Sequence, residues 1–242
     1  MVEDISKIPL CTPLYVKLPI IAIVHHIHGK TLFRELPLPL AFSLYLLEKV
    51  IAMFYKKIKI VTVSESSKRE LIKVGIPKNN INVIYNGIDH ESLKPGQKSK
   101  KPLIIYFGRV KKYKRIDHLI MAFKIVKERI PEAKLLIAGK GDAYDKLQDL
   151  IKKLKLKDVK LCGEVSHEEK IKILQKGWVL VIPSMKEGWG ITVLEANACG
   201  TPAIAYDVPG LRDSIIRDKT GLLVKEDGNV KKLAESIIRV LL

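Results

Sequence analysis

The sequence predicts an α/β protein built around parallel strands with helices on both faces. Short runs of branched apolar residues recur along the 242 residues, and most are apolar throughout rather than alternating with polar residues. Strands buried on both faces have this continuous pattern, whereas half-exposed strands alternate. Segments with helical periodicity separate most of these runs. Together these observations predict a doubly wound sheet.

Seven of the apolar runs are predicted as strands, at 19–24, 58–63, 81–85, 102–108, 133–139, 179–184 and 202–206. The clearest helix extends from Ile116 to Ile130, because its apolar residues recur at the spacing that places them on one helical face. Similar patterns predict helices over 142–154, 167–175 and 229–242.

A polar and basic segment containing Pro and Gly, residues 92–102, is predicted as a linker between two domains. The part after it, 103–242, has the size of one α/β domain. The part before it, 1–91, holds about three of the predicted strands, which is few for a doubly wound domain. We therefore expect a partial first domain and a nearly complete second one.

The charge predicts anionic partners. Lysine and arginine number 43 against 26 aspartate and glutamate, giving a net charge of +17. Nucleic acid, a membrane surface and phosphorylated small molecules all suit this charge. We expect no nucleic-acid binding, because the sequence has no helix-turn-helix, RNP, KH or zinc-finger pattern and few aromatics among its lysines.

The cysteines and the longest apolar stretch predict a cytoplasmic protein. Cys11, Cys162 and Cys199 are far apart and odd in number, which disfavours a disulfide framework or a zinc site. The stretch 36–54 is interrupted by Glu48 and Lys49. The N-terminus has no basic region followed by an apolar one. We expect neither secretion nor membrane insertion.

Two acids, Glu187 and Glu195, flank the turn Gly188-Trp189-Gly190 between a predicted strand and a predicted helix. This turn follows the carboxyl end of a parallel strand, where open α/β sheets bind ligands. The glycines let the backbone approach a ligand, and the helix start offers unpaired N–H groups to an anion.

The acids could hold the two ends of a hydroxyl-rich ligand with phosphate between them, as in a sugar nucleotide. In the alternative interpretation, Glu187 complements the helix dipole and Glu195 is a solvated helix residue. Taken alone, the pair fits both interpretations, and Trp189 taken alone fits a core or rim aromatic better than a ligand contact.

Cations gather after the strand that ends at Gly108. Arg109 and Lys114 are suited to stabilise the charge of a departing diphosphate, which is larger in the transition state than in the ground state. The alternative is a solvated basic loop, which we prefer for the neighbouring cations Lys111, Lys112 and Arg115.

Gly139 and Gly141 lie between a predicted strand and a predicted helix. Their turn could bring a nucleotide against the backbone, and an ordinary strand-to-helix turn explains them equally well. The third glycine of the dinucleotide fingerprint is missing, so we do not predict NAD binding.

His25, His26 and His28 raise the question of a metal site. Strand alternation sends His25 and His26 to opposite faces, and no other metal-ligand spacing supports them. We expect no metal here.

These segments together resemble the family 4 glycosyltransferases, which are retaining enzymes with two Rossmann-like domains in the GT-B fold. Glu187 and Glu195 are similar to the E-x7-E motif of the family in its setting "EGWG…EANACGTP". The stretch "FGRVKKYKRIDHLI" is similar to its phosphate-binding segment. Two further stretches, "VTVSESSKREL" and "VIYNGID", resemble the late first domain and the segment before the linker. The resemblance covers nearly the whole chain.

The resemblance implies a role for each matched position. Glu187 would hold the sugar hydroxyls and Glu195 the ribose hydroxyls, while Arg109 and Lys114 would neutralise the diphosphate. His25 would reach the reaction centre from the first domain. The remaining donor-site positions would be Gly108, Gly141, Val165, Gly188, Trp189, Gly190 and Ile191.

The resemblance departs from the family at both ends of the chain. A complete first domain would open with a βαβ half that carries a glycine-rich loop, whereas this sequence begins in a segment similar to the middle of that domain. The last predicted helix similarly stops before the terminal helices of the family. We expect a nucleotide-sugar domain that is nearly complete and an acceptor-side domain that is not.

The resemblance implies a retaining glycosyltransferase that moves a hexose from a nucleoside-diphosphate sugar to a glycan or lipid-linked acceptor, without a cofactor or divalent metal. A non-catalytic nucleotide-sugar-binding fragment of a longer enzyme is the alternative. The apolar and basic segment 44–59 fits docking on the cytoplasmic face of an anionic membrane, and it fits a buried helix equally. These motifs are shared by members with different donors, so the base, sugar, acceptor and linkage stay open.

Overall fold

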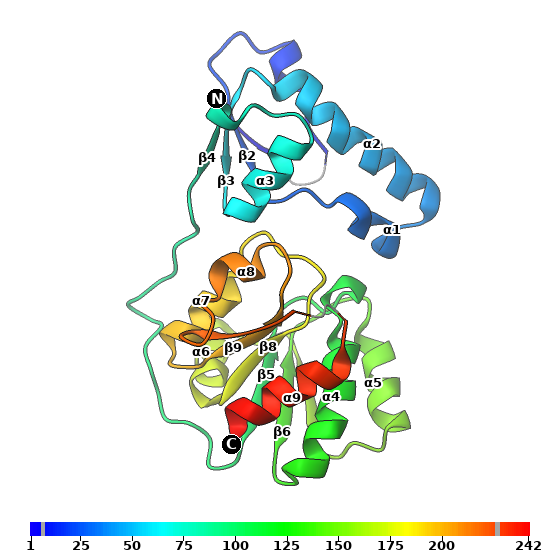
Figure 1. Ribbon diagram of the computed structural model, residues 1–242, viewed down its shortest axis with the longest axis vertical. Helices are drawn as coiled ribbons and strands as arrows, with labels where there is room; N and C mark the ends of the chain where they lie inside the picture. The colour runs from blue at the N-terminus through cyan, green and yellow to red at the C-terminus, as the bar shows by residue number, and fades with distance from the viewer. Residues whose placement is uncertain (6–7, 226–227) are drawn as a thin grey trace. The chain divides into compact units, whose positions relative to one another are not determined.

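The computed structural model describes residues 1–5, 8–225 and 228–242 (Figure 1). The chain forms two compact units, each with its own parallel sheet. The first unit comprises residues 1–86 and 186–189, and the second unit comprises 87–185 and 190–242. The predicted α/β class with two parallel sheets is confirmed.

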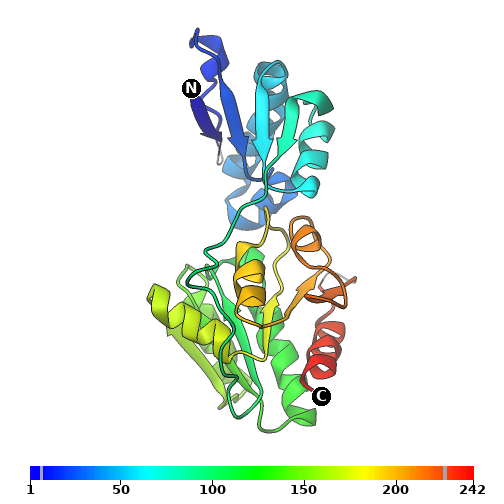
Figure 2. The same ribbon diagram turned by 90° about the vertical axis from the view of Figure 1, so that its left-hand side faces the viewer.

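The first unit contains a four-stranded parallel sheet in the order β1-β2-β3-β4 (Figure 2). Its strands are β1 (Val2–Ile5), β2 (Ile21–Val24), β3 (Lys59–Thr62) and β4 (Ile81–Val83). Its helices are α1 (Leu32–Glu35), α2 (Leu38–Tyr55) and α3 (Glu65–Lys73), with short 3-10 turns at Thr12–Leu14, Gly29–Thr31 and Lys78–Asn80. Three of these strands were predicted, whereas β1 was not.

Strand β1 was not predicted because its sequence, VEDI, contains two acids and so lacks the continuous apolar pattern of the predicted strands. One of them, Glu3, is nevertheless only 3% exposed. Its carboxylate accepts hydrogen bonds from the Tyr55 hydroxyl at 2.7 Å, from the Leu10 amide at 2.8 Å and from the Thr12 hydroxyl. Burial and the neighbouring carboxylate raise the pKa of Tyr55 far above its usual value. A buried acid in a strand is acceptable when its oxygens are satisfied in this way.

Helix α2 packs one side against the core of the first unit. Its buried residues are Ala41, Glu48, Ile51 and Tyr55. Glu48 accepts hydrogen bonds from the backbone amides of His28 and Gly29 at 2.6 and 2.8 Å, and so fixes the loop after β2. The opposite side exposes a stripe of apolar side chains, formed by Leu38, Phe42, Leu46 and Met53.

Within the described part of the chain, α2 is the one helix whose length and apolar composition would suffice to cross a membrane. That test depends on length and composition alone, and a helix that covers the core of a globular unit also passes it.

The second unit contains a six-stranded parallel sheet in the order β10-β9-β8-β5-β6-β7. Its strands are β5 (Leu103–Phe107), β6 (Lys134–Ala138), β7 (Val159–Gly163), β8 (Val179–Ile182), β9 (Ala203–Tyr206) and β10 (Gly221–Val224). Counted from the first strand of this unit, the order is that of a doubly wound Rossmann sheet. Its direction reverses between β5 and β8.

Helices cover both faces of this sheet (Figures 1 and 2). They are α4 (Ile116–Arg129), α5 (Tyr144–Lys153), α6 (His167–Lys176), α7 (Ile191–Ala198), α8 (Leu211–Ser214) and α9 (Val230–Leu241), with a 3-10 turn at Lys112–Lys114. Helix α4 packs with α5 and α9, and α6 packs with α7 and β5. Every residue of β8 and β9 is buried, as the continuous apolar pattern predicted. Strands β7 and β10 were not predicted, and both are edge strands.

The segment predicted as a linker, 92–102, runs along the second unit. The indole of Trp178 donates to the Ser99 carbonyl at 2.9 Å, and the amide of Gln175 donates to the Lys94 carbonyl at 2.9 Å. Lys98 donates to Thr201, and its burial lowers the pKa of the Lys98 ammonium. The segment is therefore fastened to the second unit along its length.

Candidate functional site

The strand order of the second unit reverses between β5 and β8. The loops that follow these two strands therefore lie on either side of the reversal point. Strand β5 ends at Phe107 and continues into Gly108 and Arg109, while the chain after β8 leads to the start of α7 at Ile191. Adjacent connections leave for opposite faces at such a point, which opens a crevice at the carboxyl ends of the strands. The sequence motifs around Arg109 and Glu195 both belong to this end of the sheet.

A cavity of about 360 Å³ lies at this end. It is lined by Phe107, Gly108, Arg109, Gly139, Lys140, Glu164 and Val165. These residues come from the carboxyl ends of β5, β6 and β7, and the volume falls within the range of small-molecule sites. The structure thus brings together three predicted site residues, Gly108, Arg109 and Val165.

The two glycines after β6 have a packing role. A Cβ at Gly139 would lie 1.8 Å from the Gly108 carbonyl oxygen, and one at Gly141 would lie 2.0 Å from the Val110 carbonyl oxygen. Gly139 also has φ +141°, which disfavours any side chain. Both glycines therefore let the turn after β6 pack directly on the backbone after β5. Gly139 lines the cavity, whereas Gly141 is not among its lining residues.

Lys140 and Glu164 form an ion pair at the cavity, with 2.6 Å between Nζ and Oε2. The hydrogen bond from Lys140 and then its charge lower the pKa of Glu164. Both side chains are about 70% exposed, so the pair contributes little to stability. A ligand could displace it at small cost.

Tyr113 joins the two predicted phosphate-binding cations. Arg109 donates to the Tyr113 hydroxyl at 3.2 Å, and Lys114 Nζ lies 5.0 Å from the centre of the Tyr113 ring. The Tyr113 carbonyl accepts a hydrogen bond from the Met185 amide at 2.9 Å, which ties this turn to the segment after β8. A second phenol, that of Tyr106, donates to the Arg109 carbonyl at 2.9 Å. Neither tyrosine was among the predicted site residues.

The other cations of this segment have three different environments. Lys111 pairs with Asp142 at 2.7 Å, and Lys112 is exposed. Arg115 is only 9% exposed, and its guanidinium lies 5.9 Å from the centre of the Tyr206 ring. The interpretation of Arg115 as a solvated residue is therefore wrong. Its backbone is left-handed, with φ +49°.

Glu195 is a buried acid with one occupied oxygen. It is 9% exposed, and its Oε1 lies 2.5 Å from Lys170 Nζ. Its Oε2 is buried and has no hydrogen-bond partner within the described part of the structure. The alternative interpretation of Glu195 as a solvated helix residue is wrong. A buried hydrogen-bond acceptor without a donor costs free energy, and the hydroxyl of a ligand would supply the missing donor.

The start of α7 requires its glycine. Gly190 precedes the helix with φ +80°, and a Cβ there would lie 2.9 Å from the Leu211 side chain. Ile191, the first helical residue, is 42% exposed. Gly200, which follows α7, has φ +74°.

The remaining predicted site residues belong to the first unit. His25 follows β2, and its Nε2 lies 3.5 Å from Asp4 Oδ1. Residues 186–189, which include Glu187 and Gly188, also belong to this unit by their contacts.

Trp189 is 9% exposed and stacks on Tyr85, with 4.7 Å between ring centres. This environment agrees with its interpretation as a core or rim aromatic. Among the described residues, no group of three or more His, Cys, Asp or Glu side chains is arranged to hold a metal ion.

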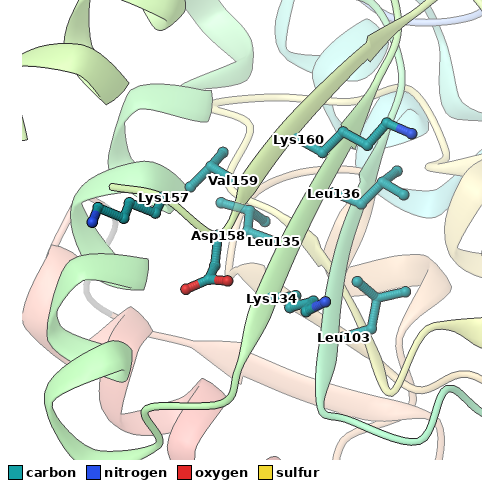
Figure 3. A pocket seen from close by; sticks show the side chains of 8 residues that line it. All are labelled: Leu103, Lys134, Leu135, Leu136, Lys157, Asp158, Val159 and Lys160. Carbon is teal, nitrogen blue, oxygen red and sulfur yellow. The ribbon is translucent and has the colours of Figure 1, made fainter. Parts of the chain in front are cut away.

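A second cavity, of about 260 Å³, lies at the amino ends of β5, β6 and β7 (Figure 3). Its lining includes Lys157 and Lys160, whose amino groups point away from each other (Figure 3). The carboxylate of Asp158 is engaged by Lys127 at 2.6 Å. Ligands of open α/β sheets bind at the carboxyl ends instead, so the first cavity is the candidate site.

Comparison with known proteins identifies two family regions in the chain. Residues 88–242 match the family of glycosyl transferases group 1, and residues 8–92 match glycosyltransferase family 4. The first match alone covers more than half of the chain.

Relatives with curated names are similar along most of the chain. An uncharacterised glycosyltransferase of Methanocaldococcus jannaschii is 34% identical over 77% of this chain and 52% of its own length. The capsular polysaccharide biosynthesis glycosyltransferase CapM of Staphylococcus aureus is 34% identical over 83% of this chain and 56% of its own length. The chain thus spans about half the length of these relatives.

Solved structures confirm the fold. Sucrose-phosphate synthase from Thermosynechococcus elongatus has a TM-score of 0.78 over 94% of this chain and 60% of its own, with 24% identity. The HepE protein of Anabaena, solved with UDP and glucose, has a TM-score of 0.73 over 91% of this chain and 61% of its own, with 21% identity. The two parallel sheets and the family matches lead to one conclusion: the chain belongs to the family 4 and group 1 glycosyltransferases, with the GT-B fold.

Proposed function

We propose that the chain is the donor-binding part, with some of the acceptor side, of a retaining glycosyltransferase. The enzyme would transfer a hexose from a nucleoside-diphosphate sugar to a hydroxyl of a glycan or a lipid-linked acceptor. The observation that carries the proposal is the buried, unpartnered Oε2 of Glu195, at the same end of the sheet as the Arg109 cavity. A ribose hydroxyl would donate a hydrogen bond to this oxygen, and the diphosphate would bind beside the Arg109 guanidinium.

In this mechanism the nucleotide lies against the carboxyl ends of β5, β6 and β7, with its base beside Glu164 and Val165. The bond between the sugar and the diphosphate breaks through an oxocarbenium-like state, and negative charge grows on the leaving group. Arg109 and Lys114 supply fixed positive charge where it grows, which stabilises the transition state more than the bound substrate. Tyr113 holds both cations, so little reorganisation is needed.

Three further roles complete the proposal. Glu187 would position the sugar hydroxyls, and His25 would approach the reaction centre. The backbone around Gly188, Gly190 and Ile191 would line the sugar and phosphate positions. The proposed mechanism requires no bound metal, because Arg109 and Lys114 would stabilise the negative charge of the leaving diphosphate. The donor-site role of Gly141 is indirect, since it packs the neighbouring turn.

A second function is a nucleotide-sugar-binding fragment without transferase activity. The chain spans about half the length of its named relatives. Both functions place the nucleotide in the second unit, and they differ in whether sugar is released or transferred.

The test is a thermal-shift screen with UDP, GDP and ADP and their hexose conjugates, followed by an assay for sugar release and transfer. A ligand at 100 times its Kd stabilises the folded state by about 2.7 kcal/mol. We expect one base to raise the melting temperature clearly above the other two. Binding without sugar release or transfer would favour the fragment, and no shift with any nucleotide would contradict both functions.

We also propose that the protein works in the cytoplasm at an anionic membrane surface. The exposed stripe of α2 is apolar, and exposed lysines Lys49, Lys56 and Lys57 lie on or just beyond that helix. Apolar and basic residues together suit an anionic bilayer surface. Phe42→Ser should reduce co-sedimentation with phosphatidylglycerol vesicles, while Ile72→Ser on α3 should not. Equal binding of both variants would contradict this proposal.

A further inference from the structure

We propose that Lys170 is a positioning residue for Glu195 and thereby sets the preference of the site for ribose over deoxyribose. No sequence motif pointed to Lys170. The inference rests on the proposed function, in which Glu195 accepts a hydrogen bond from a ribose hydroxyl.

Lys170 and Glu195 form a sheltered ion pair between two helices. Lys170 lies in the first turn and a half of α6, and Glu195 lies in α7. Their side chains are 16% and 12% exposed, and Nζ lies 2.5 Å from Oε1. A pair so far removed from water holds its geometry more firmly than a surface pair, which side-chain entropy and solvent weaken.

The ion pair gives the two oxygens of the Glu195 carboxylate different environments. Oε1 is occupied by the ammonium, and Oε2 is buried without a partner in the described structure. A carboxylate fixed at one oxygen can rotate little, so the other oxygen keeps one direction. That oxygen accepts a hydrogen bond well only from a donor placed in that direction, such as a hydroxyl of a bound ligand.

Phe107 connects the pair to the cavity. Lys170 Nζ lies 5.2 Å from the centre of the Phe107 ring, within the range of a cation–π contact. Phe107 also lines the cavity that contains Arg109. The Lys170 ammonium therefore contacts both the Phe107 ring and the Glu195 carboxylate. Because Phe107 lines the cavity, this ion pair lies beside the proposed nucleotide position.

A purely structural role is the competing explanation, because the pair also links α6 to α7. That role predicts a lower melting temperature for a Lys170 variant and no change in ligand preference. The positioning role predicts a change in preference for one specific hydroxyl. Discrimination between ribose and deoxyribose separates the two.

The experiment uses titration calorimetry with UDP, 2′-deoxy-UDP and 3′-deoxy-UDP, or the corresponding series for the base that the thermal-shift screen selects. A hydrogen bond to a charged group contributes enough for wild-type protein to prefer the ribose form by roughly 10- to 100-fold over one deoxy form. Lys170→Met should reduce that ratio to below about 3-fold, and Lys170→Arg, which keeps the ion pair, should retain most of it.

Matched variants keep the result interpretable. Lys172→Met makes the same change at an exposed position of α6 and should leave the ratio at the wild-type value. If Lys170→Met does not fold, Lys170→Gln replaces it, and the melting temperature of each variant is recorded.

The outcomes distinguish a failure of the Lys170 role from a failure of the proposed function. A wild-type ratio that persists in Lys170→Met or Lys170→Gln, with nucleotide still bound, overturns the role of Lys170 and leaves the proposed function intact. Failure of wild-type protein to bind any nucleoside diphosphate overturns both. A wild-type protein that binds ribose and both deoxy forms equally also overturns the inference.

Discussion

Arg109 shows how the residues of this site are held by their neighbours. Its carbonyl accepts a hydrogen bond from Tyr106, and its guanidinium donates to Tyr113. The backbone and the charged end are thus fixed separately. Under the proposed function, such a cation would be in place before charge develops on the leaving group, which is the condition for electrostatic catalysis.

Arg109→Ala should lower turnover by roughly 10²–10³-fold, by analogy with the loss of one donor from an oxyanion hole. The measurement is the initial rate of donor consumption at saturating donor. Lys112→Ala, which removes an exposed cation of the same segment, serves as the control and should keep its rate. An Arg109→Ala protein with the wild-type rate would disprove the charge-stabilising role.

Tyr113→Phe removes the hydroxyl that Arg109 contacts and keeps the ring over which Lys114 lies. The loss of one hydrogen bond to a charged group should lower kcat by roughly 10-fold or more with little change in the melting temperature. Steady-state kinetics and a thermal melt measure the two effects.

Tyr206→Phe is the control for that variant, because its hydroxyl lies 3.1 Å from His118 Nδ1 in the same unit and outside the cavity. It should lower the melting temperature and leave kcat unchanged. If both tyrosine variants behaved alike, Tyr113 would have only a structural role.

At the scale of an element, the C-terminal end of α4 is fastened by one side chain. Lys127 donates to the carbonyls of Pro131 and Ala133 and, at 2.6 Å, to the carboxylate of Asp158 just before β7. Its positive charge also suits the negative end of the helix dipole. One lysine therefore joins a helix end, a turn and a strand start.

Lys127→Met should lower the free energy of unfolding by about 1–2 kcal/mol, because it removes these hydrogen bonds from a partly exposed site. Lys124→Met, an exposed change in the same helix, should cost much less. Urea denaturation of both variants at neutral pH measures the difference. Equal stabilities would show that the Lys127 contacts contribute nothing.

The Lys127 effect should depend on pH. The hydrogen bond and then the charge of Lys127 lower the pKa of Asp158 from its usual 3.8 in the folded state. A lowered folded-state pKa stabilises the protein above the unfolded-state pKa, and this stability is lost as the pH falls through the folded-state value. The gap between wild type and Lys127→Met should therefore narrow below about pH 4. A gap that stays constant down to pH 2.5 would contradict the ion-pair contribution.

At the scale of the whole molecule, the two units have separate cores. The buried cluster of the first unit is the smaller, and its β1 strand and the following segment expose many apolar side chains, including Val2, Ile8, Leu10, Leu14, Tyr15 and Leu18. A small core supports less stability than a large one. We expect the first unit to unfold at the lower temperature.

Calorimetric melting should therefore give two transitions, and a saturating nucleoside diphosphate should raise the upper one. Stabilisation by about 2.7 kcal/mol at 100 times the Kd corresponds to a shift of roughly 5–10 °C for a unit of this size. The lower transition, which belongs to the first unit, should shift less than the upper one, because the proposed contacts of the base, the ribose and the Arg109 cation lie in the second unit. A ligand that shifts only the lower transition would place the nucleotide elsewhere.

The sequence by itself determined the α/β class and the central strands, and it supplied the candidate residues of the proposed site. Strands β8 and β9 were predictable because full burial in a parallel sheet demands an uninterrupted apolar run. The motif after β5 pointed to Gly108 and Arg109, and the family resemblance pointed to Val165; these three residues line one cavity. Strand β1 was not predictable, because the buried Glu3 carboxylate accepts hydrogen bonds from distant parts of the chain, such as Tyr55.

Only the tertiary structure decided which partners the site residues have. Lys170 meets Glu195 from a different helix, Arg115 turns inward onto Tyr206, and Gly139 packs on the backbone of Gly108. None of these pairs is close in sequence or marked by periodicity. Local patterns report which side of an element is buried, whereas the contact between two elements depends on the strand order and the packing of the whole unit.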